Sequence, residues 1–235
     1  MRHTYRGIIF DLDGTMVNTE HYADIAWRHY LQKNGYDPEK MPESVVGAAR
    51  PDCIRAFKET YGADFDYVTA SAGVRIEKYR LFDEAETIVK EGLIPLMDYA
   101  DANGIRMAIG SSSQRVYVDH VLEVAGLTGR FDAIVTGDDA VHGKPDPEIF
   151  LRSAELLGII PNECIVIEDS RNGMLAGTAG GFTTLLIPDT GTVSGDPDGV
   201  FERVASGIKP AENLTILKNL SEALAWMRGR IAAEQ

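Results

Sequence analysis

Short apolar runs alternate with helical patterns along most of this 235-residue chain, and this alternation limits the possible folds more than any other feature. Each run is typical of a buried strand, because it is brief and bounded by polar or glycine-containing turns. Strands that alternate with helices predict parallel βαβ units, and therefore an α/β protein. The apolar runs are Gly7–Phe10, Arg106–Ile109, Ala133–Val135, Cys164–Ile167 and Thr183–Ile187.

The region from Thr19 to Val89 departs from this alternation, because it contains helical patterns without a convincing strand. We therefore expect an α-helical subdomain of residues 19–89, inserted into a core formed by residues 1–18 and 90–235. The expected core is Rossmann-like and has three layers, with a parallel sheet between helices. Because the insertion begins soon after the first strand, we expect it to sit over the end of that strand.

Two acids one residue apart, Asp11 and Asp13, follow the first predicted strand and precede Gly14 and Thr15. Asp and Gly are depleted in strands, so we expect the strand to end here. Open α/β folds bind ligands at the carboxyl edge of the sheet, and side chains two positions apart on a strand point the same way. The pattern therefore indicates paired carboxylates at a binding edge; the alternative is a turn after a surface strand.

Three further polar motifs, Gly110–Ser113, Gly143–Pro147 and Glu168–Ser170, follow the ends of predicted strands. Parallel strands that meet at one edge would gather these motifs beside the paired acids. The expected catalytic residues at that edge are Asp11, Asp13, Ser111 and Lys144, with the carboxylates of Glu168 and Asp169 next to them.

Such a set of groups is suited to phosphoryl transfer. Clustered carboxylates repel one another and attract a divalent cation, and ligands that are all oxygen favour Mg²⁺. Asp11 could attack phosphorus and form an aspartyl-phosphate, while Asp13 protonates the leaving oxygen and later activates water. A phosphate monoester carries a charge of about −1.5 to −2, which Lys144 alone cannot offset together with three ionised carboxylates. The residues themselves therefore predict dependence on Mg²⁺.

In this order, the motifs resemble those of the haloacid dehalogenase superfamily, in its branch of phosphatases and β-phosphoglucomutases with a helical cap. Phe10–Thr15 matches the first motif, Ser111 the second, Lys144 the third and Glu168-Asp169 the fourth. The resemblance covers nearly the whole chain. It implies that the inserted helices form a mobile cap, which closes over the substrate and excludes water.

The resemblance also implies roles for individual residues. The metal would be held by the Asp11 side chain, the Asp13 backbone carbonyl and Asp169, and Glu168 would act through water or by adjusting its neighbour. The expected metal residues are thus Asp11, Asp13, Glu168 and Asp169. The expected phosphate-binding residues are Gly14, Thr15, Ser111, Ser112 and Lys144.

Residues of the expected cap would select the substrate. Asn18-Thr19-Glu20 occupies a stretch that often reads Asp-Ser-Glu in the family and lines the opening to the site. Gly47–Arg50 resembles a substrate loop, so Arg50 could reach a sugar hydroxyl or a distal phosphate, and Arg75 is a further candidate. The alternative for both arginines is an ordinary exposed side chain.

We expect an Mg²⁺-dependent phosphatase that acts on a small phosphorylated metabolite such as a sugar phosphate. The first alternative is a phosphohexomutase, but β-phosphoglucomutases carry a histidine on the first cap helix where this chain has Ala23. A remote alternative is a phospho-accepting signalling module. The acids on the first strand argue against it, because such modules are shorter and take phosphate on a mid-chain strand.

Charge and cysteine content limit the possible partners and compartment. A formal charge of −13 argues against nucleic-acid binding, which needs clustered basic residues. The two cysteines, Cys53 and Cys164, are far apart, so a reducing compartment fits best. With neither a signal peptide nor a membrane span in the pattern, we expect a cytoplasmic monomer whose partner is the substrate alone.

Overall fold

The computed structural model describes residues 5–42, 50–189, 207–209 and 211–231, except for the side chains of Glu20, Arg50 and Ile231. The chain divides into two compact units. Residues 1–18 and 88–235 form an α/β unit, and residues 19–87 form a helical unit.

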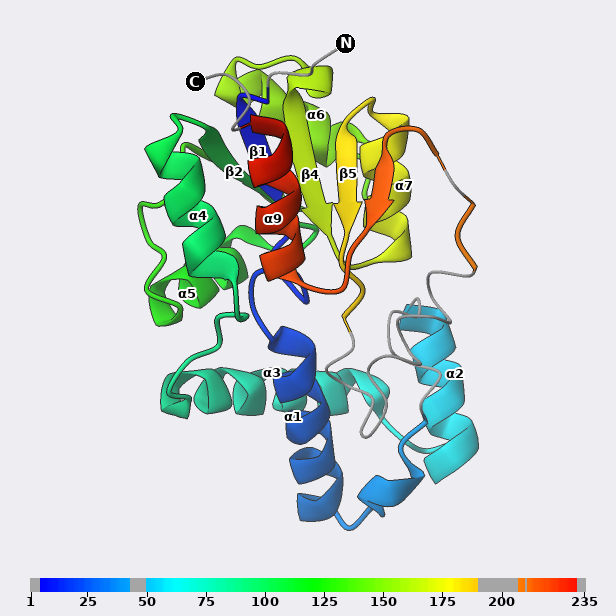
Figure 1. Ribbon diagram of the computed structural model, residues 1–235. Coiled ribbons are helices and arrows are strands. Elements are labelled where there is room, and N and C mark those ends of the chain that lie inside the picture. The colour runs from blue at the N-terminus through cyan, green and yellow to red at the C-terminus, as the bar shows by residue number, and fades with distance from the viewer. Residues whose placement is uncertain (1–4, 43–49, 190–206, 210, 232–235) are drawn as a thin grey trace. The chain divides into compact units, whose positions relative to one another are not determined.

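A six-stranded parallel sheet forms the centre of the α/β unit, with strand order β3-β2-β1-β4-β5-β6 (Figure 1). This confirms the predicted parallel α/β core. Five strands coincide with apolar runs of the sequence, whereas β6 is a short edge strand of half-buried residues and is not predicted. The strands are β1 (Gly7–Phe10), β2 (Arg106–Gly110), β3 (Ala133–Val135), β4 (Cys164–Glu168), β5 (Thr183–Leu186) and β6 (Leu214–Ile216).

The strand β1 lies in the middle of the sheet, because all four of its residues are apolar or small enough to be buried on both faces. It pairs with β2 and β4, and Phe10 is aligned with Ile109 and Ile167. This register brings the carboxyl ends of the three central strands to the same level.

Helices cover the sheet, with α9 in front of β1 and β4 in the view of Figure 1 and α6 behind them. A buried cluster that includes Ile9, Val166 and Phe150 joins α6 to the sheet. On the other side α4 packs against α9. The helices in the described part of this unit are α4 (Leu93–Ala102), α5 (Arg115–Val124), α6 (Glu148–Leu157), α7 (Arg171–Ala179) and α9 (Leu220–Ile231), with a short 3₁₀ turn at Pro161–Glu163.

In the described part of residues 19–87 all regular structure is helical, as predicted for the insertion. The elements are α1 (Thr19–Lys33), the 3₁₀ turn Pro38–Lys40, α2 (Arg50–Tyr61) and α3 (Tyr67–Glu84). This unit has its own core, in which Leu31, Phe57 and Phe65 are buried among further aromatic rings. Asp66 begins α3 by accepting hydrogen bonds from the backbone N–H groups of Val68 and Thr69.

The two ends of the insertion meet in the α/β unit. The N–H of Asn18 donates to the carbonyl of Ile88 at 2.8 Å, and Val17 pairs with Val89 in an antiparallel bridge. Ile88 and Val89 therefore group with the α/β unit. None of the described helices combines the length and the apolar character that a membrane crossing requires.

Candidate active site

The predicted motifs meet at the carboxyl edge of the central strands. Asp11 follows β1, and its N–H donates to the carbonyl of Ile167 in β4 at 2.9 Å. Ser111 follows β2, and its N–H donates to the carbonyl of Val135 in β3 at 3.0 Å. The side chains of Asp11, Ser111 and Glu168 are buried there, although buried polar groups are uncommon without partners or function.

Lys144 joins the third motif to the first and the fourth. It comes from the loop between β3 and α6, and its ammonium group donates to Asp11 Oδ1 and, at 2.7 Å, to Glu168 Oε1. The ammonium nitrogen also lies 4.6 Å from the centre of the Phe150 ring. Burial alone would lower the pKa of Lys144, but the carboxylates of Asp11 and Glu168 raise it above its ordinary value. The lysine therefore remains a buried cation at neutral pH.

Burial raises the pKa of Asp11 to about 8, since the opposing effect of Lys144 is outweighed by desolvation and by the nearby carboxylates of Glu168 and Asp13. Burial therefore disfavours the ionised form of Asp11 that the sequence predicts. A divalent cation next to the carboxyl group would favour its ionised form, which is the form that can attack phosphorus.

Oxygens of Asp11, Glu168 and Asp169 lie within 4.8 Å of one another, which is close enough for one cation to contact them. Burial raises the pKa of Asp169 well above its ordinary value, and the carboxylates of Glu168 and Asp11 raise it further. Hard oxygen donors whose mutual repulsion is incompletely offset fit Mg²⁺. The residues present are therefore suited to the metal that the sequence predicts.

Both oxygens of Glu168 already accept hydrogen bonds. Lys144 occupies Oε1, and the N–H and hydroxyl of Ser170 donate to Oε2 at 2.7 and 2.9 Å. Gly173 in the first turn of α7 makes room for this carboxylate, because a Cβ there would lie 1.7 Å from Glu168 Oε1. The arrangement suits a residue that holds Lys144 better than one that ligates a metal directly.

Asp13 is held by two hydroxyl groups, one at the end of the motif Gly110–Ser113 and one on α5, and the motifs do not reveal this role of either. Ser113 donates to its Oδ2 at 2.7 Å, and Tyr117 donates to its Oδ1 at 2.6 Å. Ser113 immediately precedes the N-cap residue of α5 and Tyr117 lies in its first turn, so both side chains are near the start of this helix. The short separation of Ser113 and Tyr117 in the sequence indicates a shared partner only after the second motif has been placed beside Asp13.

Gly14 and Thr15, which we expected near phosphate, contact the acidic cluster. Gly14 has a φ of 74°, and a Cβ there would lie 2.2 Å from Asp169 Oδ2, so glycine is required for both reasons. The hydroxyl of Thr15 donates to Asp169 Oδ1 at 3.3 Å. Two residues outside the motifs adjoin this loop: Lys90 donates to the Gly14 carbonyl and forms an ion pair with Asp189 at 2.9 Å.

The second motif forms a tight turn. The Ser111 hydroxyl accepts a hydrogen bond from the N–H of Ser113 at 3.1 Å. Gly137 lies against this turn, since a Cβ there would come 2.4 Å from the carbonyl oxygen of Ser112. The turn places the buried Ser111 side chain at the edge of the sheet, whereas the side chain of Ser112 is exposed.

Glu148 organises the loop that carries Lys144. Its two carboxylate oxygens accept hydrogen bonds from the backbone N–H groups of Val141 and His142, at 2.9 and 2.8 Å. These bonds lower the pKa of Glu148 to about 2. The carboxylate thereby ties the start of α6 to the residues that precede Lys144.

The residues expected to select the substrate are less well placed. The side chains of Glu20 and Arg50, and residues 47–49 before the latter, lie outside the part of the chain that the structure describes. Arg75 is exposed on α3.

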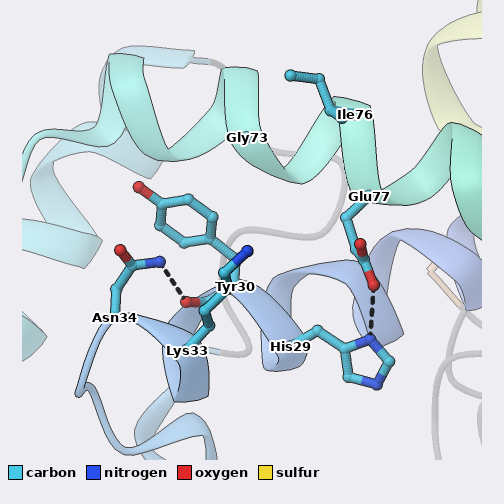
Figure 2. A pocket seen from close by; sticks show the side chains of 7 residues that line it. All are labelled: His29, Tyr30, Lys33, Asn34, Gly73, Ile76 and Glu77. Carbon is cyan, nitrogen blue, oxygen red and sulfur yellow. Dashed lines mark hydrogen bonds and ion pairs between the residues drawn. The ribbon is translucent and has the colours of Figure 1, made fainter.

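A surface pocket of about 500 Å³ lies between α1 and α3 and contains none of the predicted site residues. Figure 2 shows the Tyr30 ring directed toward Gly73 on α3 and the imidazole of His29 directed toward Glu77, with a distance of 2.9 Å from Nδ1 to Oε1. The ring fits because a Cβ at Gly73 would lie 2.5 Å from it. The pocket is lined by His29, Tyr30, Lys33, Asn34, Gly73, Ile76 and Glu77.

Comparison with known proteins agrees with this geometry. Residues 5–181 match the family haloacid dehalogenase-like hydrolase. The chain is 34% identical to fructose-1-phosphate phosphatase YqaB of Escherichia coli, over 77% of this chain and 96% of that protein. It is 30% identical to hexitol phosphatase A of the same organism, over 77% of this chain and 82% of the relative.

Among solved structures, a HAD family hydrolase from Deinococcus radiodurans with bound phosphate and sodium is 26% identical, with a TM-score of 0.74 and 97% of each chain covered. A β-phosphoglucomutase from Clostridium difficile is 25% identical, with a TM-score of 0.68 and 97% of each chain covered. Both similarities extend over the α/β unit and the helical insertion together.

Proposed function

The chain belongs to the haloacid dehalogenase-like hydrolases and is a phosphatase of that family, and from this premise we propose that it hydrolyses phosphate monoesters of sugars or sugar alcohols with Mg²⁺. We take the α/β unit, residues 1–18 and 88–235, as the catalytic core and the helical unit, residues 19–87, as the cap, so Ile88 and Val89 belong to the core rather than to the insertion expected over residues 19–89. The observation that carries the mechanism is Lys144, buried between Asp11 and Glu168 at the edge of the sheet.

Asp11 is the proposed nucleophile. Its carboxylate oxygen attacks phosphorus, the bond from phosphorus to the substrate oxygen breaks, and an aspartyl-phosphate remains. Lys144 donates hydrogen bonds to the phosphoryl oxygens as negative charge develops on them, and the hydroxyl of Ser111 assists it. Glu168 holds Lys144 in place for this task.

Mg²⁺, held by the side chains of Asp11 and Asp169 with the backbone carbonyl of Asp13, would supply the positive charge that lets an anionic ester approach these acids. Thr15 orients Asp169 through its hydroxyl group. Burial and then the neighbouring carboxylates raise the pKa values of Asp11 and Asp169, and a cation beside these groups would offset both effects.

Asp13 is the proposed general acid and base. It gives its proton to the leaving oxygen in the first step and accepts a proton from the attacking water in the second, which releases phosphate and restores Asp11. Ser113 and Tyr117 hold the two oxygens of Asp13, so the carboxyl group keeps one orientation through both steps.

The proposed substrates follow from the relatives, whose names refer to fructose 1-phosphate, to hexitols and to phosphorylated carbohydrates. Hydrolysis is favoured over a mutase reaction because Ala23 offers no acid–base group on α1. Glu20, Arg50 and Arg75 are the proposed contacts to the sugar.

A panel of phosphate esters tests the proposal. Fructose 1-phosphate, a hexitol phosphate, glucose 6-phosphate and β-glucose 1-phosphate would each be incubated with the enzyme and Mg²⁺, and phosphate release would be measured. We expect release from at least one ester, loss of activity in EDTA and loss in Asp11→Asn. Conversion of β-glucose 1-phosphate to the 6-phosphate without free phosphate would instead establish a mutase.

A further inference from the structure

Lys90 and Asp189 form an ion pair beside the proposed cation site, although neither belongs to a motif. Lys90 Nζ lies 2.9 Å from Asp189 Oδ1 and also donates to the carbonyl of Gly14. The two side chains are 21% and 9% exposed. Because charges that are largely buried are poorly screened by salt, the pair acts on the groups around it.

Lys90 is fixed by its backbone as well as by its side chain. Its N–H donates to the carbonyl of Met16 at 2.9 Å, and the preceding residue, Val89, pairs with Val17. The chain at Lys90 therefore runs along the first-motif loop, and the ammonium group returns to that loop at Gly14. The position of this positive charge is thus set by three contacts with one loop.

Asp189 approaches the same loop beside the metal-binding carboxylate. A Cβ on Gly14 would lie 2.2 Å from Asp169 Oδ2 and 3.3 Å from Asp189 Oδ2, so both oxygens face one point. Asp189 follows β5 by three residues, and the last residue of β5, Leu186, is aligned with Glu168. Asp189 therefore adds one carboxylate to the acidic cluster, and Lys90 adds one cation.

We propose that Lys90 and Asp189 act in opposite directions on the affinity of the acidic cluster for its divalent cation, with Lys90 lowering it and Asp189 raising it by a similar amount. The inference rests on the proposed function, because the pair adjoins the proposed Mg²⁺ site. Adjacent charges of opposite sign largely cancel at a third point. The pair thereby anchors the loop at Gly14 while leaving the net charge around the cation unchanged.

Mg²⁺ binding is measured without substrate or phosphate, from the stabilisation that Mg²⁺ gives against thermal unfolding along a titration. We expect Lys90→Met to bind Mg²⁺ about fivefold more tightly and Asp189→Asn about fivefold more weakly, the effect of one solvent-screened unit charge on a divalent ion. The double variant should lie within about twofold of the wild-type protein. The Mg²⁺ affinity of Lys90→Arg, which keeps the charge, should also lie within about twofold of the wild-type value.

Lys33→Met is the matched control, because it removes the same charge from an exposed position at the end of α1. Its Mg²⁺ affinity should equal that of the wild-type protein. The inference is overturned if both single variants bind Mg²⁺ more weakly and the double variant is not restored, since the pair would then act through loop packing alone. Unchanged affinity in both single variants also overturns it.

Failure of the proposed function gives a different result. The wild-type protein would then release no phosphate from any ester of the panel, whatever its response to Mg²⁺. A wild-type protein that hydrolyses esters but is not stabilised by Mg²⁺ would contradict both the cation site and the role of Lys90 and Asp189.

Discussion

Gly173→Ala tests the position of the Glu168 carboxylate, on which the geometry of Lys144 depends. A Cβ at position 173 would lie 1.7 Å from Glu168 Oε1 and 2.4 Å from Oε2. Glu168 is only 1% exposed, and hydrogen bonds from Lys144 and Ser170 hold both oxygens. Because the Glu168 carboxylate is enclosed on all sides, an alanine at position 173 must displace it from its hydrogen bonds with Lys144 and Ser170.

The expected loss of unfolding free energy in Gly173→Ala follows from the contacts that the new Cβ breaks. Separating the partners of a buried ion pair costs about 3–5 kcal/mol of unfolding free energy. Replacing a helical glycine by alanine stabilises the helix by about 1 kcal/mol, and this gain applies equally to Gly173→Ala and to a control variant in another helix. Gly229→Ala is the matched control, because Gly229 is an exposed residue of α9 with no atom within 4 Å of a Cβ built there. The difference between the two variants should therefore be about 3–5 kcal/mol.

Urea unfolding measures this difference. Trp226 in α9 reports on the α/β unit, and a Trp27→Phe background removes the signal of the other tryptophan. With a slope of a few kcal/mol per molar urea, the midpoints of the two variants should differ by about 1 M or more. Phosphate release should fall in Gly173→Ala and persist in Gly229→Ala. Equal midpoints together with full activity in Gly173→Ala would refute the placement of Glu168.

Two further predictions concern other contacts. Tyr117→Phe removes the hydroxyl that donates to Asp13 at 2.6 Å, and kcat should fall about 10- to 100-fold, because a misoriented acid–base group loses part of its contribution. Steady-state kinetics measure this, and a kcat within twofold of the wild-type value would contradict it. In the helical unit, the pKa of Glu77 is lowered from 4.5 to about 2, mainly by hydrogen bonds from Arg80 and to a smaller extent by the one from His29. The resulting stabilisation, about 1 kcal/mol after allowance for solvent screening, is present above about pH 4.5 and disappears toward pH 2. Unfolding midpoints of Glu77→Gln and the wild-type protein should therefore differ at pH 7 and converge at low pH, whereas a constant difference would contradict the assignment.

The sheet could be predicted because each buried strand needs a short apolar run, and the pairing of β1 with β2 and β4 then brings the motifs together. The strand β6 could not be predicted, because a half-buried edge strand of three residues has no distinctive hydrophobic pattern. The helical character of the insertion was predictable for the opposite reason, since a long region without apolar strand runs cannot join a central sheet.

Side-chain contacts set the limit of prediction within the site. Glu168 and Asp169 are adjacent acids, and sequence alone does not show that Glu168 faces Lys144 while Asp169 faces Gly14. Tyr117 is 104 positions from Asp13, and nothing in the periodicity of α5 marks it as a partner. Asp189 is likewise hidden, because a polar residue after a strand usually belongs to an ordinary turn.

The pairing of Val17 with Val89 has a consequence for how such proteins diversify. The insertion leaves the sheet and returns to it at neighbouring backbone positions, with Asn18 and Ile88 joined by a hydrogen bond of 2.8 Å. An insert of different length or shape could therefore be exchanged at this junction without disturbing a single strand. The sheet edge that carries the proposed catalytic residues can stay constant while the inserted module is replaced as one piece.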